Sequence, residues 1–124
     1  MISHLSLGVR DLDRAGAFYD AALKPLGYVR VWTSDGALGY GVAGGNDRLA
    51  IKLRDGKTVV TSDPRFHLAL QAPDRAAVDG FYTRALESGG RSAGAPGPRP
   101  QYSPTYYAAF VLDPDGHRIE AVHQ

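Results

Sequence analysis

Hydrophobic and polar residues alternate in short stretches of this chain, and two longer stretches between them have helical spacing. Over His4–Val9 every second residue is Leu or Val, which predicts a strand with one apolar face and one more polar face. Asp11 or Asp13 can then cap a helix whose apolar stripe runs to Leu23. Gly27 follows as a stop signal, so a strand–helix unit is predicted for the first part of the chain.

The remaining pattern completes two units of the same kind. Further strands of the first unit are predicted over Tyr28–Trp32, Leu38–Ala43 and Arg48–Leu53. The second unit is predicted as a strand over Phe66–Gln71, a helix over Pro73–Ser88, and strands over Arg91–Ala93, Tyr106–Leu112 and His117–Val122. The Gly- and Pro-rich segment Gly94–Thr105 is expected to be a stiff loop.

The two units are copies of one another. At a constant spacing of 63 residues, nine of the 24 positions from 4 to 27 are identical, where unrelated stretches would share about one or two. The identical positions are His4, Leu5, Leu7, Asp11, Phe18, Tyr19, Ala22, Leu23 and Gly27. The repeat predicts an α+β fold with two tandem βαβββ modules, residues 1–54 and 65–124, joined by a connector at 55–64. Their polar sheet faces would form a partly open, barrel-like cleft with one histidine from the start of each copy.

Composition narrows the class of protein. The 124 residues carry a net charge of +1, which gives no electrostatic reason to expect nucleic acid or a membrane as partner. Cysteine is absent, so disulfides and thiolate metal sites are excluded. The first residues lack the basic and apolar regions of a signal peptide, and a cytoplasmic location is expected.

The closing stretch is the most specific motif. Asp113-Pro114-Asp115-Gly116 is followed after two residues by Ile119-Glu120, and each module begins with a histidine strand. In these features the whole chain resembles the vicinal oxygen chelate superfamily, which includes glyoxalase I, bleomycin-resistance proteins, extradiol dioxygenases and fosfomycin-resistance thiol transferases. The resemblance implies the glyoxalase/bleomycin-resistance/dioxygenase fold and a small-molecule ligand, but one scaffold serves many reactions.

The resemblance also implies a metal site. Metal ligands of the superfamily lie on the first and last strands of each module, which corresponds to His4, His67 and Glu120 here. Alignment of the last strands places Ala50 at the fourth position. Two imidazoles and one carboxylate suit Fe, Mn, Zn, Ni or Co and leave positions open for a chelating substrate.

Two other interpretations remain at this stage. The two histidines could be kept for packing and hydrogen bonding within the repeat. Some superfamily members bind ligands without metal, so the alternative function is a metal-free binding or sequestration protein of the bleomycin-resistance type. In that case Trp32 and the tyrosine-rich loop would form the walls of the binding site.

Strand alternation selects further candidates for the cleft. Three basic residues lie two positions from Ala50 or Glu120 along a predicted strand and therefore on the same sheet face, namely Arg48, Lys52 and Arg118. They would bind an anionic substrate unless they point into solvent. Tyr106 and Tyr107 are adjacent in a predicted strand and so point to opposite sheet faces, and one of them is expected to face the cleft as a catalytic phenol. Tyr102 is expected to contact the substrate.

Together, these predictions indicate a small divalent-metal-dependent enzyme acting on a substrate with two vicinal oxygens. A lyase, dioxygenase or thiol-transferase type of reaction is not distinguished. A true glyoxalase I is not expected, because such enzymes use a glutamate where Ala50 stands. Related proteins often dimerise, so we expect a homodimer. Its cleft would be completed either within one chain or by His4 from one chain and His67 and Glu120 from the other.

Overall fold

The computed structural model describes residues 1–56, 63 and 65–124 and contains two modules of the same order. The first consists of β1 (Leu5–Val9), α1 (Leu12–Leu23), the 3-10 helix η1 (Lys24–Leu26), β2 (Val29–Thr33), β3 (Ala37–Gly41) and β4 (Asp47–Leu53). The second consists of β5 (Leu68–Gln71), α2 (Arg75–Glu87), β6 (Arg91–Pro98), β7 (Tyr107–Leu112) and β8 (Arg118–His123). Most of the connector expected at 55–64 lies outside the described residues.

Each module forms one open four-stranded sheet, with strand orders β1-β4-β3-β2 and β5-β8-β7-β6. The first and last strands of a module are parallel and the other pairs are antiparallel. Ser6 pairs with Ala50, and Ala69, its counterpart in the repeat, pairs with Glu120. The α+β fold with two tandem βαβββ modules is therefore confirmed, and the sheets stay open rather than closing into a barrel.

Aspartate caps begin both helices, as the sequence predicts. The Asp11 carboxylate accepts a hydrogen bond from the backbone N–H of Arg14 at 2.9 Å, and Asp74 accepts one from Ala77 at 2.7 Å. These bonds satisfy N–H groups that have no partner in the first turn of a helix. Of the two caps that the sequence allowed for the first helix, the structure uses Asp11 rather than Asp13.

The strand β6 differs most from the sequence prediction. It continues to Pro98 rather than ending at Ala93, so the loop expected from Gly94 begins only after Pro98. Register shifts interrupt its pairing with β7 around Gly94 and Gly97. A strand with these shifts tolerates proline because β6 is an edge strand and needs fewer backbone N–H donors.

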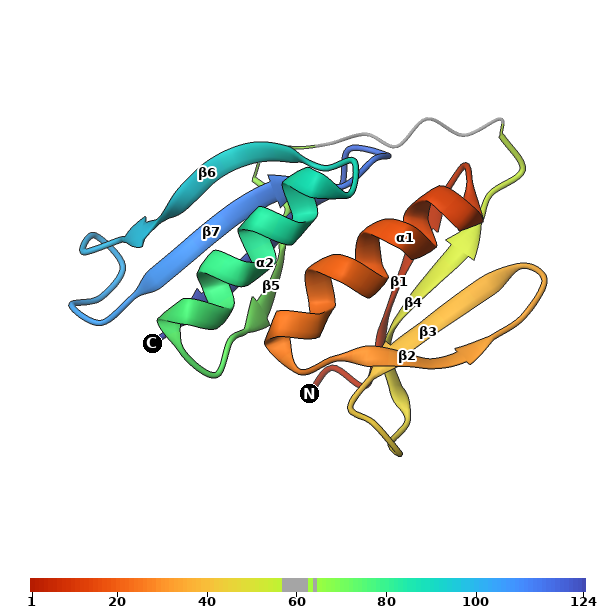
Figure 1. Ribbon diagram of the computed structural model, residues 1–124, viewed down its shortest axis with the longest axis horizontal. Coiled ribbons are helices and arrows are strands. Elements are labelled where there is room, and N and C mark those ends of the chain that lie inside the picture. Colours follow the sequence, from red (N-terminus) through yellow and green to blue (C-terminus); the bar gives the residue numbers. More distant parts are fainter. Residues whose placement is uncertain (57–62, 64) are drawn as a thin grey trace.

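The two helices lie side by side on one side of the molecule, with the two sheets behind them (Figure 1). Because the helices pack against each other, the apolar faces of both modules contribute to one core. The largest fully buried apolar side chains of this core are Phe18, Tyr19, Tyr40, Phe81, Leu23, Ile51, Ile119, Val9, Val78 and Val111. The opposite face of the second sheet carries Arg118 and Glu120 of β8.

The closing Asp-Pro-Asp-Gly turn joins the second module to the first. Asp113 is buried and accepts a 2.7 Å hydrogen bond from the Tyr19 hydroxyl, while its other oxygen accepts the backbone N–H groups of Asp115 and His117. Asp115 accepts the backbone N–H of Arg10 at 3.0 Å and pairs with its guanidinium. Burial and the neighbouring Asp113 raise the pKa of Tyr19 well above its usual value, so its hydroxyl remains a donor.

Replacing Tyr19 by Phe is expected to lower the free energy of unfolding by about 1–3 kcal/mol, because a buried Asp113 oxygen loses its donor. Tyr82 is the matched control, since it occupies the same repeat position but donates to Ser92 in an exposed hydrogen bond. Tyr82→Phe should change stability by less than about 0.5 kcal/mol. Urea unfolding of both variants measures the difference in the free energy of unfolding. Equal losses in the two variants would show that the hydrogen bond from Tyr19 to Asp113 adds no stability beyond that of an exposed one.

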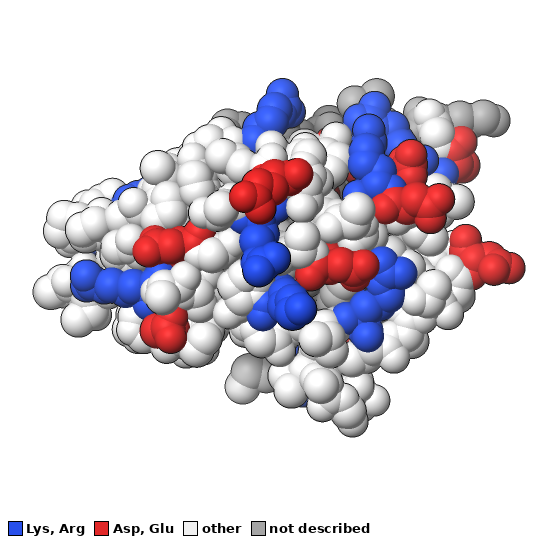
Figure 2. Space-filling view, in the orientation of Figure 1, with Lys and Arg blue, Asp and Glu red and all other residues white. Residues whose placement is uncertain are grey.

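The outer surface carries mixed charge. Figure 2 shows Lys and Arg next to Asp and Glu over the face formed by the helices. Within the first module, Arg30 forms an ion pair with Asp20, and their closest atoms are 2.6 Å apart. Among the described residues, neither helix has the length and apolar character needed to cross a membrane.

Candidate active site

Glu120 is the central group of the candidate site. It lies in β8 between Ile119 and Ala121, which both face the core, so strand alternation turns its side chain to the opposite face of the sheet. Its side chain is nevertheless only 1% exposed. A carboxylate buried to this extent requires partners that compensate for the loss of water.

His67 is the first of these partners. Its Nε2 lies 2.8 Å from Oε2 of Glu120, and its side chain is 37% exposed, so one edge of the pair is open to solvent. His67 directly precedes β5, the strand that runs parallel to β8. The Phe110 ring contacts the imidazole edge-on at a centroid distance of 5.7 Å and restricts its orientation.

Tyr106 is the second partner of Glu120. Its hydroxyl donates to Oε1 at 2.6 Å, so both carboxylate oxygens have a partner. Desolvation, with the hydrogen bond to Glu120 adding to it, raises the pKa of Tyr106 to about 12. The phenol is therefore protonated at neutral pH and acts as a donor rather than a base. Tyr102 packs edge-on against it at 5.1 Å.

Two cavities meet at this cluster. The first has a volume of about 240 Å³ and is lined by His67, Tyr102, Tyr106, Phe110 and Glu120. The second, of about 410 Å³, shares three of these residues and is lined by Arg65, His67, Ala93, Gly94, Arg99, Tyr102, Phe110 and Arg118. A buried carboxylate and an accessible imidazole thus lie at the wall of a partly aromatic cleft.

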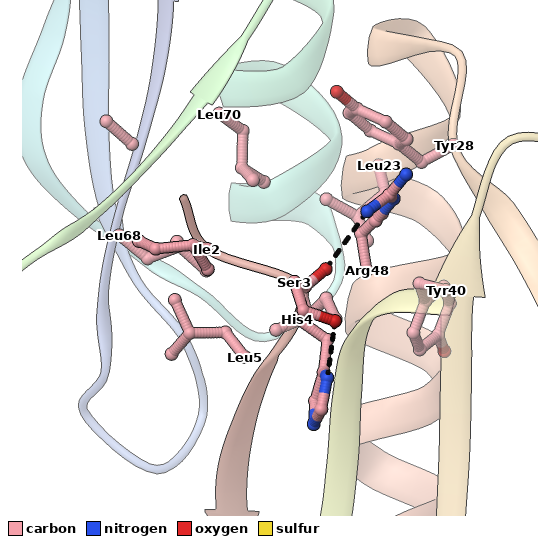
Figure 3. Close-up of a pocket in the computed structure, with 12 residues that line it drawn as sticks. Ile2, Ser3, His4, Leu5, Leu23, Tyr28, Tyr40, Arg48, Leu68 and Leu70 are labelled. Carbon is pink, nitrogen blue, oxygen red and sulfur yellow. Dashed lines mark hydrogen bonds between the residues drawn. The ribbon is translucent and has the colours of Figure 1, made fainter. Parts of the chain in front are cut away.

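His4 lies outside the cluster formed by His67, Tyr106 and Glu120. It is exposed, its Nδ1 is 3.3 Å from the Ser3 hydroxyl, and it borders a cavity of about 250 Å³ between the modules. Figure 3 shows its ring directed away from Tyr28 and Leu70 in the wall of that cavity. Within residues 1–56, 63 and 65–124 no three His, Cys, Asp or Glu side chains come together as a potential metal site. A single chain thus brings together His67 and Glu120 but not His4.

The expected substrate contacts are divided between different places. Arg118 and Tyr102 line the larger cavity beside His67. Arg48 instead donates to the backbone oxygen of Ser3 and lines the cavity between the modules. Lys52 is exposed on β4, in the other sheet.

Tyr107, the other candidate phenol, has a different position from Tyr106. Its hydroxyl donates to Asp79 of α2 at 2.7 Å, and the guanidinium of Arg75 lies 4.9 Å above its ring. The hydrogen bond to Asp79 raises the pKa of Tyr107. Of the two adjacent tyrosines, the structure therefore places Tyr106 beside Glu120 and Tyr107 on the helix side of the sheet.

Ala50 occupies the position in the first module that corresponds to Glu120. It pairs with Ser6 and Gly39, as Glu120 pairs with Ala69 and Phe110. The indole of Trp32 lies over Gly39, where a side-chain Cβ atom would overlap it. The equivalent face of the first module therefore carries an aromatic surface and no acid at this position.

Sequence reasoning missed five lining residues of the two cavities, namely Arg65, Ala93, Gly94, Arg99 and Phe110. Phe110 could have been found, because it pairs with Glu120 across an antiparallel ladder and shares its face. The two arginines come from segments outside regular strands, at positions that no periodicity specifies.

Two tandem βαβββ modules, with a histidine–carboxylate pair at a cleft of the second one, define an α+β fold of the glyoxalase type. Residues 1–121 match the model of the Glyoxalase/Bleomycin resistance protein/Dioxygenase superfamily, and the chain belongs to this superfamily. The comparison with curated proteins gives no match.

Solved structures agree with this assignment. A glyoxalase/bleomycin resistance protein from Albidiferax ferrireducens is 28% identical with a TM-score of 0.85, and the match covers 98% of each chain. The fosfomycin resistance protein FosX from Mesorhizobium loti is 21% identical with a TM-score of 0.72, over 100% of this chain and 92% of that one, and shows the shared fold. A glyoxalase I from Zea mays is 26% identical with a TM-score of 0.71, over 96% of this chain and 44% of that one.

Proposed function

We propose that this protein is a small metal-dependent enzyme whose substrate binds through two vicinal oxygens, in the cytoplasm, beside His67 and Glu120. The observation that carries the proposal is the 2.8 Å contact between His67 Nε2 and the buried Glu120 carboxylate, at the wall of an accessible cleft. An imidazole and a carboxylate that converge in this way are two members of a ligand set suited to Fe, Mn, Zn, Ni or Co.

The protein residues have separate tasks in this proposal. His67 and Glu120 would hold the metal, and Tyr106 orients Glu120 through its 2.6 Å hydrogen bond. A bound divalent metal would supply Lewis acidity toward a substrate carbonyl or alkoxide, or a place for O₂. Tyr102 and Phe110 form the aromatic wall that excludes water from one side of the substrate. Ala50 supplies no carboxylate, which argues against glyoxalase I chemistry.

The third ligand is proposed to come from a second copy of the chain. His4 borders the space between the modules rather than the Glu120 cleft. The strands β1 and β5 are each paired on one side only, and the apolar side chains of Ile2 and Phe66 beside them are exposed. We propose that a dimer covers these edges and brings His4 of one copy to His67 and Glu120 of the other. Sedimentation at micromolar concentration should give the mass of two chains, and the mass of one chain would contradict this assembly.

Metal content after purification without chelator tests the main proposal. We expect about one divalent ion per site, or uptake of about one on titration. A screen of each metal with catechols, methylglyoxal–thiol adducts and fosfomycin then assigns the reaction. No bound metal and no uptake would refute the proposal.

Ala50→Glu is expected to raise metal affinity by about tenfold or more, because a second carboxylate would complete the set of four metal-ligand positions. Ala50 is only 3% exposed, so the variant apoprotein should be less stable than the parent. Isothermal titration with Mn(II) or Zn(II) measures the gain. Thr33→Glu, at an exposed position of the edge strand β2, is the control for a carboxylate added to a sheet away from the proposed site. Equal affinities of Ala50→Glu and the parent protein would remove Ala50 from the site.

A second candidate function is metal-free binding of an aromatic compound. The aromatic rings of Tyr102, Tyr106 and Phe110 around one cavity support it, as does Trp32 over Gly39. Trp32 is the single tryptophan, so its fluorescence reports ligands at this surface. Ligand binding that is unchanged by chelator would favour sequestration over metal-dependent chemistry.

A further inference from the structure

The larger cavity beside His67 has a one-sided charge. Arg65, Arg99 and Arg118 line it, and no Asp or Glu is among its lining residues in the described part of the chain. Its volume is about 410 Å³, enough for a small organic group in addition to solvent. It shares His67, Tyr102 and Phe110 with the cavity that contains Glu120, so one ligand can occupy both spaces.

Arg99 is held in this cavity by the surrounding backbone. Its Nη2 donates to the carbonyl of Ala95 at 2.8 Å and its Nη1 to the carbonyl of Pro98 at 3.3 Å. A Cβ atom at Gly94 or Gly97 would lie 3.5 or 3.2 Å from these guanidinium nitrogens. The two glycines therefore leave space for the guanidinium to lie along β6.

The ring of Phe110 completes the support for Arg99, whose guanidinium carbon lies 5.9 Å from the ring centroid. Fixing a guanidinium on an aromatic ring and two carbonyls reduces the conformational entropy that it loses when a ligand binds. The two carbonyl contacts leave other N–H groups of the fork available.

Arg118 supplies a second cation from a regular strand. It precedes Glu120 by two residues in β8, so both side chains project from the same sheet face. Arg65 lies at the rim and is paired with Asp63, which leaves Arg99 and Arg118 as the principal cations of the cavity. Since no acid is among the described residues that line this cavity, the positive charge of the two arginines is available to an incoming anion.

We infer that this cavity binds a carboxylate of the substrate, and that the substrate is a ring-bearing organic acid. The planar forks of Arg99 and Arg118 match a carboxylate, and Phe110 and Tyr102 offer surfaces for a flat ring. The inference rests on the proposed function for one point, namely that the vicinal oxygens of the same molecule lie beside His67 and Glu120. It identifies the substrate class as an aromatic acid with two adjacent oxygens.

The test compares 3,4-dihydroxybenzoate with catechol, which has the same vicinal oxygens and no carboxylate. The metal-loaded protein should bind 3,4-dihydroxybenzoate at least about tenfold more tightly in isothermal titration. Arg118→Gln should remove most of this difference and leave catechol binding within about twofold. Arg84→Gln, which removes the same charge from an exposed position of α2, should change neither ligand.

Benzoate in the presence of chelator separates failure of this inference from failure of the proposed function. If neither diol binds in a metal-dependent way, the proposed function is wrong, and saturable benzoate binding lost in Arg118→Gln would still support the anion site. If catechol and 3,4-dihydroxybenzoate bind equally in the parent and in Arg118→Gln, the inference is overturned while the metal proposal stands. Absence of benzoate binding together with absence of diol binding overturns both.

Discussion

Replacing Glu120 by Ala is expected to reduce bound divalent metal from about one ion per site to less than about a tenth. The variant removes the only anionic ligand of the proposed set. The charge of a divalent metal ion beside His67 would then have no negative charge to compensate it. Metal analysis after dialysis against a metal-buffered solution measures the loss. Circular dichroism should show the parent fold, because Glu120 makes its side-chain contacts on the sheet face opposite the core.

Tyr106→Phe is the matched control for the loss of Glu120. It removes the hydrogen bond to the same carboxylate but keeps the charge, so metal affinity should fall by about 10- to 100-fold and remain measurable. Equal metal content in Glu120→Ala and the parent would show that Glu120 is no ligand. The carboxylate would then have a structural role in binding His67 and Tyr106.

The fold was largely predictable because its determinants are local and repeated. The aspartate caps, the alternation in the strands and the identities at a spacing of 63 residues all specify the same order of elements. The exception, β6, contains two prolines and two shifts in register, and its pairing depends on the neighbouring strand β7 rather than on its own sequence. Local patterns cannot show such a dependence on a tertiary neighbour.

The candidate site was predictable where alternation within a strand decides it. Glu120 and Arg118 lie on the predicted sheet face, and His67 meets Glu120 because their strands are parallel neighbours. The position of Arg99 depends on a chain reversal after β6 and on space left by glycines, which no periodic pattern reveals. The place of His4 depends on how the modules pack together, a long-range property that the repeat leaves open.

Mixing two inactive variants is expected to restore binding sites if the cleft forms between chains. His4→Ala lacks the ligand proposed to come from one copy, and Glu120→Ala lacks a ligand proposed to come from the other. A mixed dimer contains one site with both defects and one with neither. Random reassociation should therefore restore about one quarter of the parent metal content, since about half of the dimers are mixed.

The opposite geometry predicts a different result. If His4 reached Glu120 within one chain, each site of a mixed dimer would keep one defect and mixing would restore nothing. The variants are unfolded and refolded together to ensure exchange, and each variant refolded alone is the control. Sedimentation of the mixture shows whether dimers have re-formed, so a failure of assembly is distinguished from a site within one chain. Recovery of metal binding in the mixture alone would place His4 beside His67 and Glu120 of the second copy.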